Sequence, residues 1–537
     1  MSAKSVIIGV DGATFDILDP LMAEGLMPNL AAVIDGGVRG ILKSTIHPLT
    51  PPAWTTLMTG VNPGTHGIYD FIKVDRSGAV PSYTLATSED MKAPTLWDIA
   101  SARGKRVTTL NFPVMFPARP VDGVVIPGYV PWSYLGRAIH PRSMAKRLKE
   151  LGVFKASEMS TDWQHERKAV QGLGDDQLDD WVNFHITRER RWQATLLAVM
   201  DEDPCDLTAV LFDGVDRIQH LCMHLIHPAT RDDYTSPTNA ATRALVLQYF
   251  GELDGFIGQI IAKAGPEART FIVSDHGFTR AGTRIFYANT WLEHQGLLAW
   301  KPDTAMDDQG RMALDENTEA STLIDWAGTK AYALSSSSNA IFVRVAKGAG
   351  EPGVQPADYA AFRADLVARL LDIVDPDTGR KVVAEVHLRE TAFPGPNMTE
   401  APDLTLRLHD YSFLSVLRAD LPCKDRRVAY ATHHPDGIFV AAGPGLRVGE
   451  RIDPLQIADI TPTVLYSLGL PVAHSMEGQA ATGAFTIDHL MYNSLSVASE
   501  AIPGAGTGAG GFGNSGEALP EDAAEEIKER LKALGYM

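Results

Sequence analysis

Short runs of mostly hydrophobic residues recur along the chain, and each ends at a polar or turn-forming residue. They lie at residues 5–10, 107–110, 207–212, 270–273 and 437–441. An uninterrupted apolar run of this length is typical of a strand that is buried on both faces of a sheet. The pattern therefore predicts several buried strands, the first of which ends at Asp11.

Longer segments with helical character separate these runs, at residues 145–151, 188–200, 243–264 and 359–373. Strands that alternate with helices indicate an α/β fold, in which a mostly parallel central sheet lies between two helical layers. In such αβα sandwiches, ligands bind beyond the carboxyl ends of the strands. Several candidate reactive residues follow the predicted strands directly.

Three further segments have a different character. Residues 285–425 mix polar loops with strand and helix signals, and we interpret them as an inserted cap on a catalytic domain that spans residues 1–495. The stretch IPGAGTGAGGFGNSG lies within residues 496–519, whose glycine content predicts a flexible linker. Residues 520–537 are rich in charge and predict a short C-terminal helix.

Composition narrows the class of protein. Of 537 residues 45% are hydrophobic, which excludes a largely disordered chain. The 48 Lys and Arg residues against 66 Asp and Glu residues give a net charge of −18, which disfavours binding to duplex nucleic acid or to an anionic membrane surface. A small anionic substrate is still compatible, because bound metal cations can reverse the local field.

The cysteine pattern and the length of the apolar runs bear on where the protein is located. The chain has three cysteines without CxxC spacing, and no run approaches the roughly 18 apolar residues of a membrane span. We therefore expect a soluble cytoplasmic protein without a disulfide framework. The oligomeric state is left open.

Four clusters of acidic and histidine residues carry candidate chemistry. They contain Asp11, the pair Asp216 and His220, the pair Asp275 and His276, and His433. Alone, each has an ordinary interpretation as a turn, a solvated helix face or a loop. Together they offer the mixed carboxylate and imidazole ligands of a two-metal hydrolytic site. The i, i+4 spacing of Asp216 and His220 would place both on one face of a helix.

A Thr- and Pro-rich stretch, residues 47–71, adds a possible nucleophile. Thr50 directly precedes Pro51 and Pro52, which are typical of the first turn of a helix. Its hydroxyl could simply cap that helix. Alternatively, a hydroxyl at a helix N-terminus lies beside free N–H groups, which suits a phosphate, and a nearby cation would make it nucleophilic.

Five motifs in this order resemble the alkaline phosphatase superfamily, in its type I phosphodiesterase/nucleotide pyrophosphatase branch. They are VDG (10–12), the TPPAW to HGI run (50–68), DGVDRIQH (213–220), VSDHGF (273–278) and THHPDGIFVAAGPG (432–445). The closest likeness is to predicted phosphohydrolases and phosphomutases of that superfamily. The resemblance covers residues 5 to about 480.

The resemblance implies specific roles. One metal ion would be bound by Asp216, His220 and His433. The second would be bound by Asp11, Asp275, His276 and Thr50, and Thr50 would also be the nucleophile. Zinc is usual in the superfamily, although manganese or iron would also be compatible with these ligands.

The implied activity is hydrolysis of a small phosphomonoester or phosphodiester through a phospho-threonyl intermediate. Alternatives are a phosphomutase and a non-catalytic binding protein that kept the fold. The chain has Phe71 where nucleotide pyrophosphatases carry an Asn, which puts nucleotide diester specificity in question. Substrate contacts are expected from the cap and from loops at residues 111–113 and 128–130, without individual roles.

Overall fold

The computed structural model describes residues 4–498, apart from residues 161–172, 175–176, 281–282, 309, 313–319, 336–337, 414–416 and 427–429. The C-terminal helix predicted at 520–537 and nearly all of the linker predicted at 496–519 lie outside these residues. The first residues of that linker form a short strand, β22 (Val497–Ala498), which pairs with β21 (Val472–Ala473).

Five parallel strands form the centre of the main sheet. In spatial order they are β8 (Ala268–Val273), β1 (Lys4–Val10), β7 (Leu207–Phe212), β5 (Val107–Leu110) and β6 (Gly123–Ile126). Beyond β8 the sheet continues with the antiparallel strand β18 (Asp436–Ala442), then β2 (Gly37–Lys43), with β19 (Glu450–Arg451) and β20 (Leu455–Gln456) on β2. The mostly parallel sheet is confirmed, and β18 makes it mixed.

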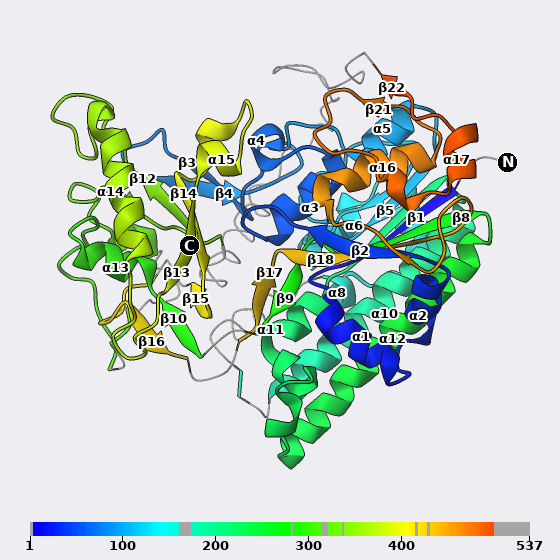
Figure 1. The fold of residues 1–537 in the computed structure, drawn as a ribbon, viewed down its shortest axis with the longest axis horizontal. Coiled ribbons are helices and arrows are strands. Elements are labelled where there is room, and N and C mark those ends of the chain that lie inside the picture. Colours follow the sequence, from blue (N-terminus) through cyan, green and yellow to red (C-terminus); the bar gives the residue numbers. More distant parts are fainter. Residues whose placement is uncertain are drawn as a thin grey trace.

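Helices cover both faces of this sheet (Figure 1). One layer contains α1 (Phe15–Ala23), α2 (Pro28–Asp35), α10 (Leu178–Glu202), α11 (Gly214–Ile226) and α12 (Pro237–Ala264), and the other contains α3 (Thr50–Thr59), α5 (Leu96–Ala102) and α16 (Ile460–Ser467). Within β1, Val6, Ile8 and Val10 pack into the first layer, whereas Ile7 packs into the second. The predicted αβα sandwich is therefore confirmed.

Smaller helices complete this part of the molecule. They are α4 (Pro63–His66), α6 (Trp132–Ala138), α7 (Arg142–Glu150), α8 (Ala156–Met159) and α17 (Ile487–Tyr492). Within the described residues, no single helix is both long and apolar enough to cross a bilayer, and only α1 and α2 together pass that test, as a pair bent by 104°.

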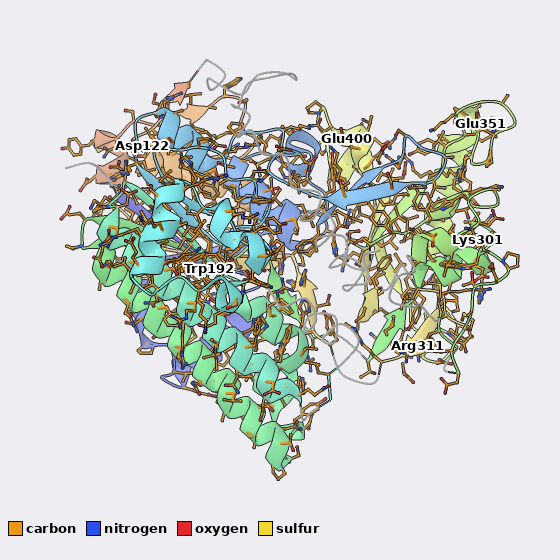
Figure 2. The ribbon with its side chains drawn as sticks, turned by 180° about the vertical axis from the view of Figure 1, so that it is seen from behind. Asp122, Trp192, Lys301, Arg311, Glu351 and Glu400 are labelled. Atoms are coloured by element: carbon orange, nitrogen blue, oxygen red, sulfur yellow. The ribbon has the colours of Figure 1, made fainter. Side chains whose placement is uncertain are left out.

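The inserted cap has its own hydrophobic core beside the sandwich (Figure 1). It contains α13 (Ala288–His294), α14 (Tyr359–Leu371) and α15 (Arg389–Ala392). One cap sheet has the order β11 (Ala331–Tyr332), β12 (Ala340–Val343), β14 (Leu404–Leu408) and β13 (Val383–Leu388), and the other β15 (Tyr411–Phe413), β10 (Arg284–Phe286) and β16 (Cys423–Asp425). From behind, Lys301, Arg311 and Glu351 lie on this cap and Trp192 lies in the opposite part (Figure 2).

A hairpin from far earlier in the chain completes the cap. It consists of β3 (Ile72–Asp75) and β4 (Ser82–Leu85). Ile72 and Tyr83 belong to the cap's hydrophobic core, and Arg76 Nη1 lies 3.0 Å from Asp403 Oδ2. The cap therefore combines residues 72–85 with residues 284–425, which the sequence pattern did not predict.

Candidate active site

Three acidic residues lie side by side at the carboxyl edge of the main sheet. Asp275 follows β8, Asp11 follows β1 and Asp213 follows β7, and each side chain is at most 1% exposed. The parallel register aligns the ends of the three strands. The carboxylates that follow the apolar runs therefore lie together at one edge of the sheet, as the strand-end pattern predicted.

Close packing of α3 on β1 places Thr50 beside Asp11. Gly9 allows this approach, because a Cβ there would lie 2.7 Å from the Trp54 ring. Trp54 Nε1 also donates to Asp11 Oδ2 at 3.1 Å. Thr50 is the first residue of α3, is buried, and has Oγ1 3.5 Å from His276 Nε2.

The start of α3 corrects one expectation. The sequence suggested free N–H groups beside Thr50, but Pro51 and Pro52 have none and the Ala53 N–H donates to Leu49 O at 3.0 Å. The three residues after Thr50 therefore offer no backbone donor to a phosphate.

His276 lies between two acidic neighbours. Its Nε2 is 3.2 Å from Asp275 Oδ2 and 3.6 Å from Asp11 Oδ1. Asp275 Oδ1 accepts a hydrogen bond from the Gly12 N–H at 3.2 Å, in a turn where Gly12 has φ 68°. Ligand atoms of Asp11, Asp275 and His276 all lie within 4.8 Å of one another.

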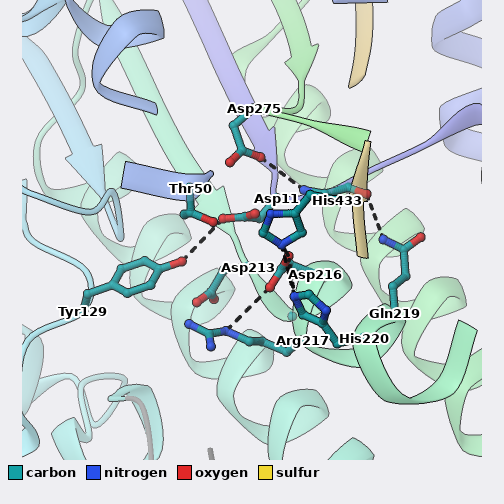
Figure 3. A network of polar contacts seen from close by, with 12 residues as sticks. Asp11, Thr50, Tyr129, Asp213, Asp216, Arg217, Gln219, His220, Asp275 and His433 are labelled. Atoms are coloured by element: carbon teal, nitrogen blue, oxygen red, sulfur yellow. Dashed lines mark hydrogen bonds and ion pairs between the residues drawn. The ribbon is translucent and has the colours of Figure 1, made fainter. Parts of the chain in front are cut away.

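A second group forms around α11. Asp216 and His220 lie on one face of this helix, as the i, i+4 spacing predicted, with His220 Nε2 3.5 Å from Asp216 Oδ1. His433 comes from β17 (Thr432–His434), which pairs with β9 (Gly277–Thr279). Its Nε2 lies 3.1 Å from both Asp216 Oδ1 and His220 Nε2 (Figure 3). Its ring stacks on that of His276, with 3.8 Å between centroids.

Backbone carbonyls orient all three imidazoles in the same way. The Nδ1 atoms lie 2.8, 2.7 and 3.1 Å from the carbonyl oxygens of Ala431, Pro48 and Gly277, for His220, His433 and His276 respectively. Because a carbonyl only accepts, each Nδ1 carries the proton and each Nε2 presents a lone pair. These lone pairs face carboxylate oxygens, and Oδ1 of Asp11 and Asp216 and Oδ2 of Asp275 have no hydrogen-bond donor within the described residues.

Such a set of buried lone pairs fits divalent cations. Without cations, burial and nearby carboxylates raise the pKa of Asp11 well above its ordinary value, and burial raises the pKa of Asp275 to about 8. Burial likewise lowers the pKa of His276 well below its ordinary value. Bound cations would provide the missing positive charge and keep the carboxylates ionised.

Asp213, the alternative to Asp216 in the sequence motif, has a different environment. It forms a buried ion pair with Arg188 of α10, and Asn111 Nδ2 lies 3.4 Å from its Oδ1. Its charge is therefore compensated from within the chain. His434, the last residue of β17, accepts a hydrogen bond at Nδ1 from the Asp436 N–H, 3.1 Å away.

The structure thus brings all seven predicted residues into one cluster. Three further side chains were not assigned roles from sequence: Trp54, Tyr129 and Arg217. The Trp54 bond to Asp11 had no signal beyond the position of Trp54 one helical turn after Thr50. Tyr129 lies in the loop at 128–130, where a substrate contact was expected, and its Oη is 3.4 Å from Asp11 Oδ2.

The fold and this cluster define a phosphoric ester hydrolase of the alkaline phosphatase superfamily. The model of the family "Type I phosphodiesterase / nucleotide pyrophosphatase" matches residues 5–434, and the chain belongs to this family. No curated protein matches the sequence at a significant level.

Solved structures with the same fold have low sequence identity. Human ectonucleotide pyrophosphatase/phosphodiesterase 5 is 13% identical, with a TM-score of 0.51 over 90% of this chain and 98% of that one. Phosphonoacetate hydrolase from Sinorhizobium meliloti 1021, in complex with phosphonoformate, is 16% identical, with a TM-score of 0.52 over 87% and 95% of the two chains. At these identities the likeness shows the fold.

Proposed function

We propose that the protein hydrolyses small phosphate esters with Thr50 as the nucleophile and two divalent metal ions, with zinc as the preferred metal. The observation that carries this proposal is that the ligand atoms of the cluster point toward one another in a buried site. Three Nε2 lone pairs and three carboxylates surround one buried hydroxyl, and the carboxylate oxygens named above lack donors. Imidazole with carboxylate is a typical zinc ligand set.

We assign the ligands to two ions as the family resemblance implies. Asp216, His220 and His433 would hold one ion, and Asp11, Asp275, His276 and Thr50 would hold the other. His276 lies within ligand reach of both groups, since its atoms also lie within 4.8 Å of those of Asp216 and His433. When bound, the ions would supply Lewis-acid charge and lower the pKa of the Thr50 hydroxyl.

The chain's own residues then perform a double displacement. The Thr50 oxygen attacks phosphorus in line, the ester oxygen departs as the alcohol, and a phospho-threonyl group forms. Water next attacks the same phosphorus and restores the Thr50 hydroxyl, which releases phosphate from a monoester substrate or a phosphomonoester from a diester. The bond from Trp54 to Asp11 and the stacking of His433 on His276 keep the surrounding groups fixed during both displacements.

The test combines metal analysis with two substrates. Purified protein should contain close to two metal ions per chain and should hydrolyse p-nitrophenyl phosphate or bis(p-nitrophenyl) phosphate. Thr50→Ala should lose at least about a thousandfold in turnover while retaining most of its metal, and Thr50→Ser should recover part of the rate. Full activity of Thr50→Ala would remove Thr50 from its role.

The same assay separates a hydrolase from a phosphomutase. With p-nitrophenyl phosphate, a hydrolase releases free phosphate in proportion to the p-nitrophenol. A mutase would return the phosphoryl group to the substrate and release little phosphate.

A cytoplasmic location and the absence of nucleic-acid and membrane partners remain predictions from composition and charge.

A further inference from the structure

The three residues that follow the nucleophile in its helix offer no backbone donor to the phosphoryl group of a substrate. Pro51 and Pro52 lack N–H groups and Ala53 is bonded to Leu49, as described above. Two other polar groups lie at the cluster: the Tyr129 hydroxyl points toward Asp11 and Thr50, and the Arg217 side chain lies beside Asp216 and Asp213 (Figure 3). Neither belongs to the proposed metal ligands.

Tyr129 is held with its hydroxyl toward the nucleophile. It has φ 58°, a left-handed conformation that a bulky side chain rarely adopts and that suggests a functional constraint. Its Oη lies 3.4 Å from Asp11 Oδ2, and its ring packs against Phe71 with 6.1 Å between centroids.

Arg217 brings positive charge to the same side. It follows Asp216 on α11, and its Nε lies 4.0 Å from Asp216 Oδ2, at the limit of an ion pair. Its guanidinium carbon lies 5.7 Å from the centre of the Tyr129 ring. The side chain is 15% exposed, so this charge is largely removed from water and acts at close range.

Resting on the proposed function, we infer that Tyr129 and Arg217 bind the unesterified oxygens of the substrate and make phosphate monoesters the preferred substrate class. A monoester dianion offers three unesterified oxygens and two charges, whereas a diester offers two oxygens and one charge. An O–H donor that points toward Thr50 and a guanidinium beside Asp216 therefore gain more from the monoester. The Phe71 side chain supports the Tyr129 ring but donates no hydrogen bond.

Kinetics with paired substrates test the assignment. The metal-loaded wild type should show a higher kcat/KM for p-nitrophenyl phosphate than for bis(p-nitrophenyl) phosphate. Tyr129→Phe and Arg217→Met should each lower the monoester value about tenfold to hundredfold and the diester value by less than about threefold. Tyr332→Phe, which alters a buried tyrosine of the cap core, is the matched control and should change neither value.

A binding measurement provides a readout without turnover. Calorimetry of inorganic phosphate with the metal-loaded Thr50→Ala protein should give a Kd that rises about tenfold when Tyr129→Phe or Arg217→Met is added. Metal content and thermal unfolding are measured on every variant. If Arg217→Met loses metal because it disturbs Asp216, the nearly isosteric Tyr129→Phe carries the test.

The outcomes separate the two proposals. Equal losses on both substrates, unchanged phosphate affinity, or a wild-type preference for the diester would overturn the monoester assignment and leave the hydrolase proposal intact. A metal-loaded wild type that hydrolyses neither ester would instead contradict the proposed function. The phosphate titration would then still decide whether Tyr129 and Arg217 form an anion site.

Discussion

Two regions of the molecule bury carboxylates in opposite ways. In the cap, Asp403 accepts from Arg76, Tyr359 and the Val343 N–H at 3.0, 2.5 and 2.8 Å. At the strand ends, Asp275 accepts the Gly12 N–H, and none of the described Lys or Arg side chains lies at ion-pair distance from it. Both side chains are at most 1% exposed.

The difference separates a structural carboxylate from a candidate ligand. Burying a charge is costly unless internal donors compensate it. The cap supplies those donors from its own arginines and tyrosines, so Asp403 needs no outside partner. The strand-end cluster combines carboxylates with imidazole lone pairs, so its compensation must come from bound cations. Burial alone would therefore be a poor guide to function here.

The largest effect is expected from a substitution of the strand-end carboxylate Asp275. Asp275→Asn should lower kcat/KM at least about a hundredfold and reduce the metal content, because a neutral amide replaces a charged ligand of nearly the same shape. Elemental analysis and steady-state rates measure both effects. An unchanged metal load would contradict the proposed role of Asp275.

Arg188 tests whether internal compensation keeps Asp213 out of the metal cluster. Arg188→Met leaves the Asp213 carboxylate buried without its partner and should lower the free energy of unfolding by about 3–5 kcal/mol. Urea unfolding of the metal-loaded protein measures this loss. Arg190→Met, on the same helix, removes a solvent-exposed pair with Glu252 and should cost at most about 1 kcal/mol. Similar values for the two variants would refute the distinction.

Substitution of a cap carboxylate should lower the stability of the protein without lowering its metal content, the reverse of what we expect for Asp275. Asp375 is fully buried and accepts from Arg284 at 2.9 and 2.6 Å and from Tyr411 at 3.0 Å. Asp375→Asn should cost about 1–3 kcal/mol of stability and leave the metal content unchanged. A loss of metal in this variant would show that the two regions do not act separately.

The smallest expected effect concerns acid stability. Burial would raise the pKa of Asp375, but Arg284 and the neighbouring donors hold it below its ordinary value of 3.8. The unfolded state then binds more protons than the folded state near that pH, so this carboxylate stabilises the fold above it and the stabilisation is lost as the pH falls. Urea titrations between pH 3 and 5 should give a shallower slope for Asp375→Asn than for the wild type.

The sequence predicted the strand-end chemistry better than its surroundings. The continuous apolar runs before Asp11 and Asp275 were sufficient to predict that these residues lie close together, because parallel strands bring their carboxyl ends to one edge of the sheet. The antiparallel direction of β18 was not predictable in this way, since an apolar run has no direction. The pairing of Arg188 with Asp213 and the reach of Tyr129 were also missed, because both depend on tertiary packing and an unusual backbone angle.

The two-piece construction of the cap limits how it can be exchanged between related proteins. Residues 284–425 form one contiguous block, but Ile72 and Tyr83 of the β3–β4 hairpin complete its core, and Arg76 binds Asp403. In a chimera that exchanges only the contiguous block, these hairpin residues would pack against side chains from the other protein. The hairpin together with the contiguous block is therefore the smallest unit that could be transferred with its core intact.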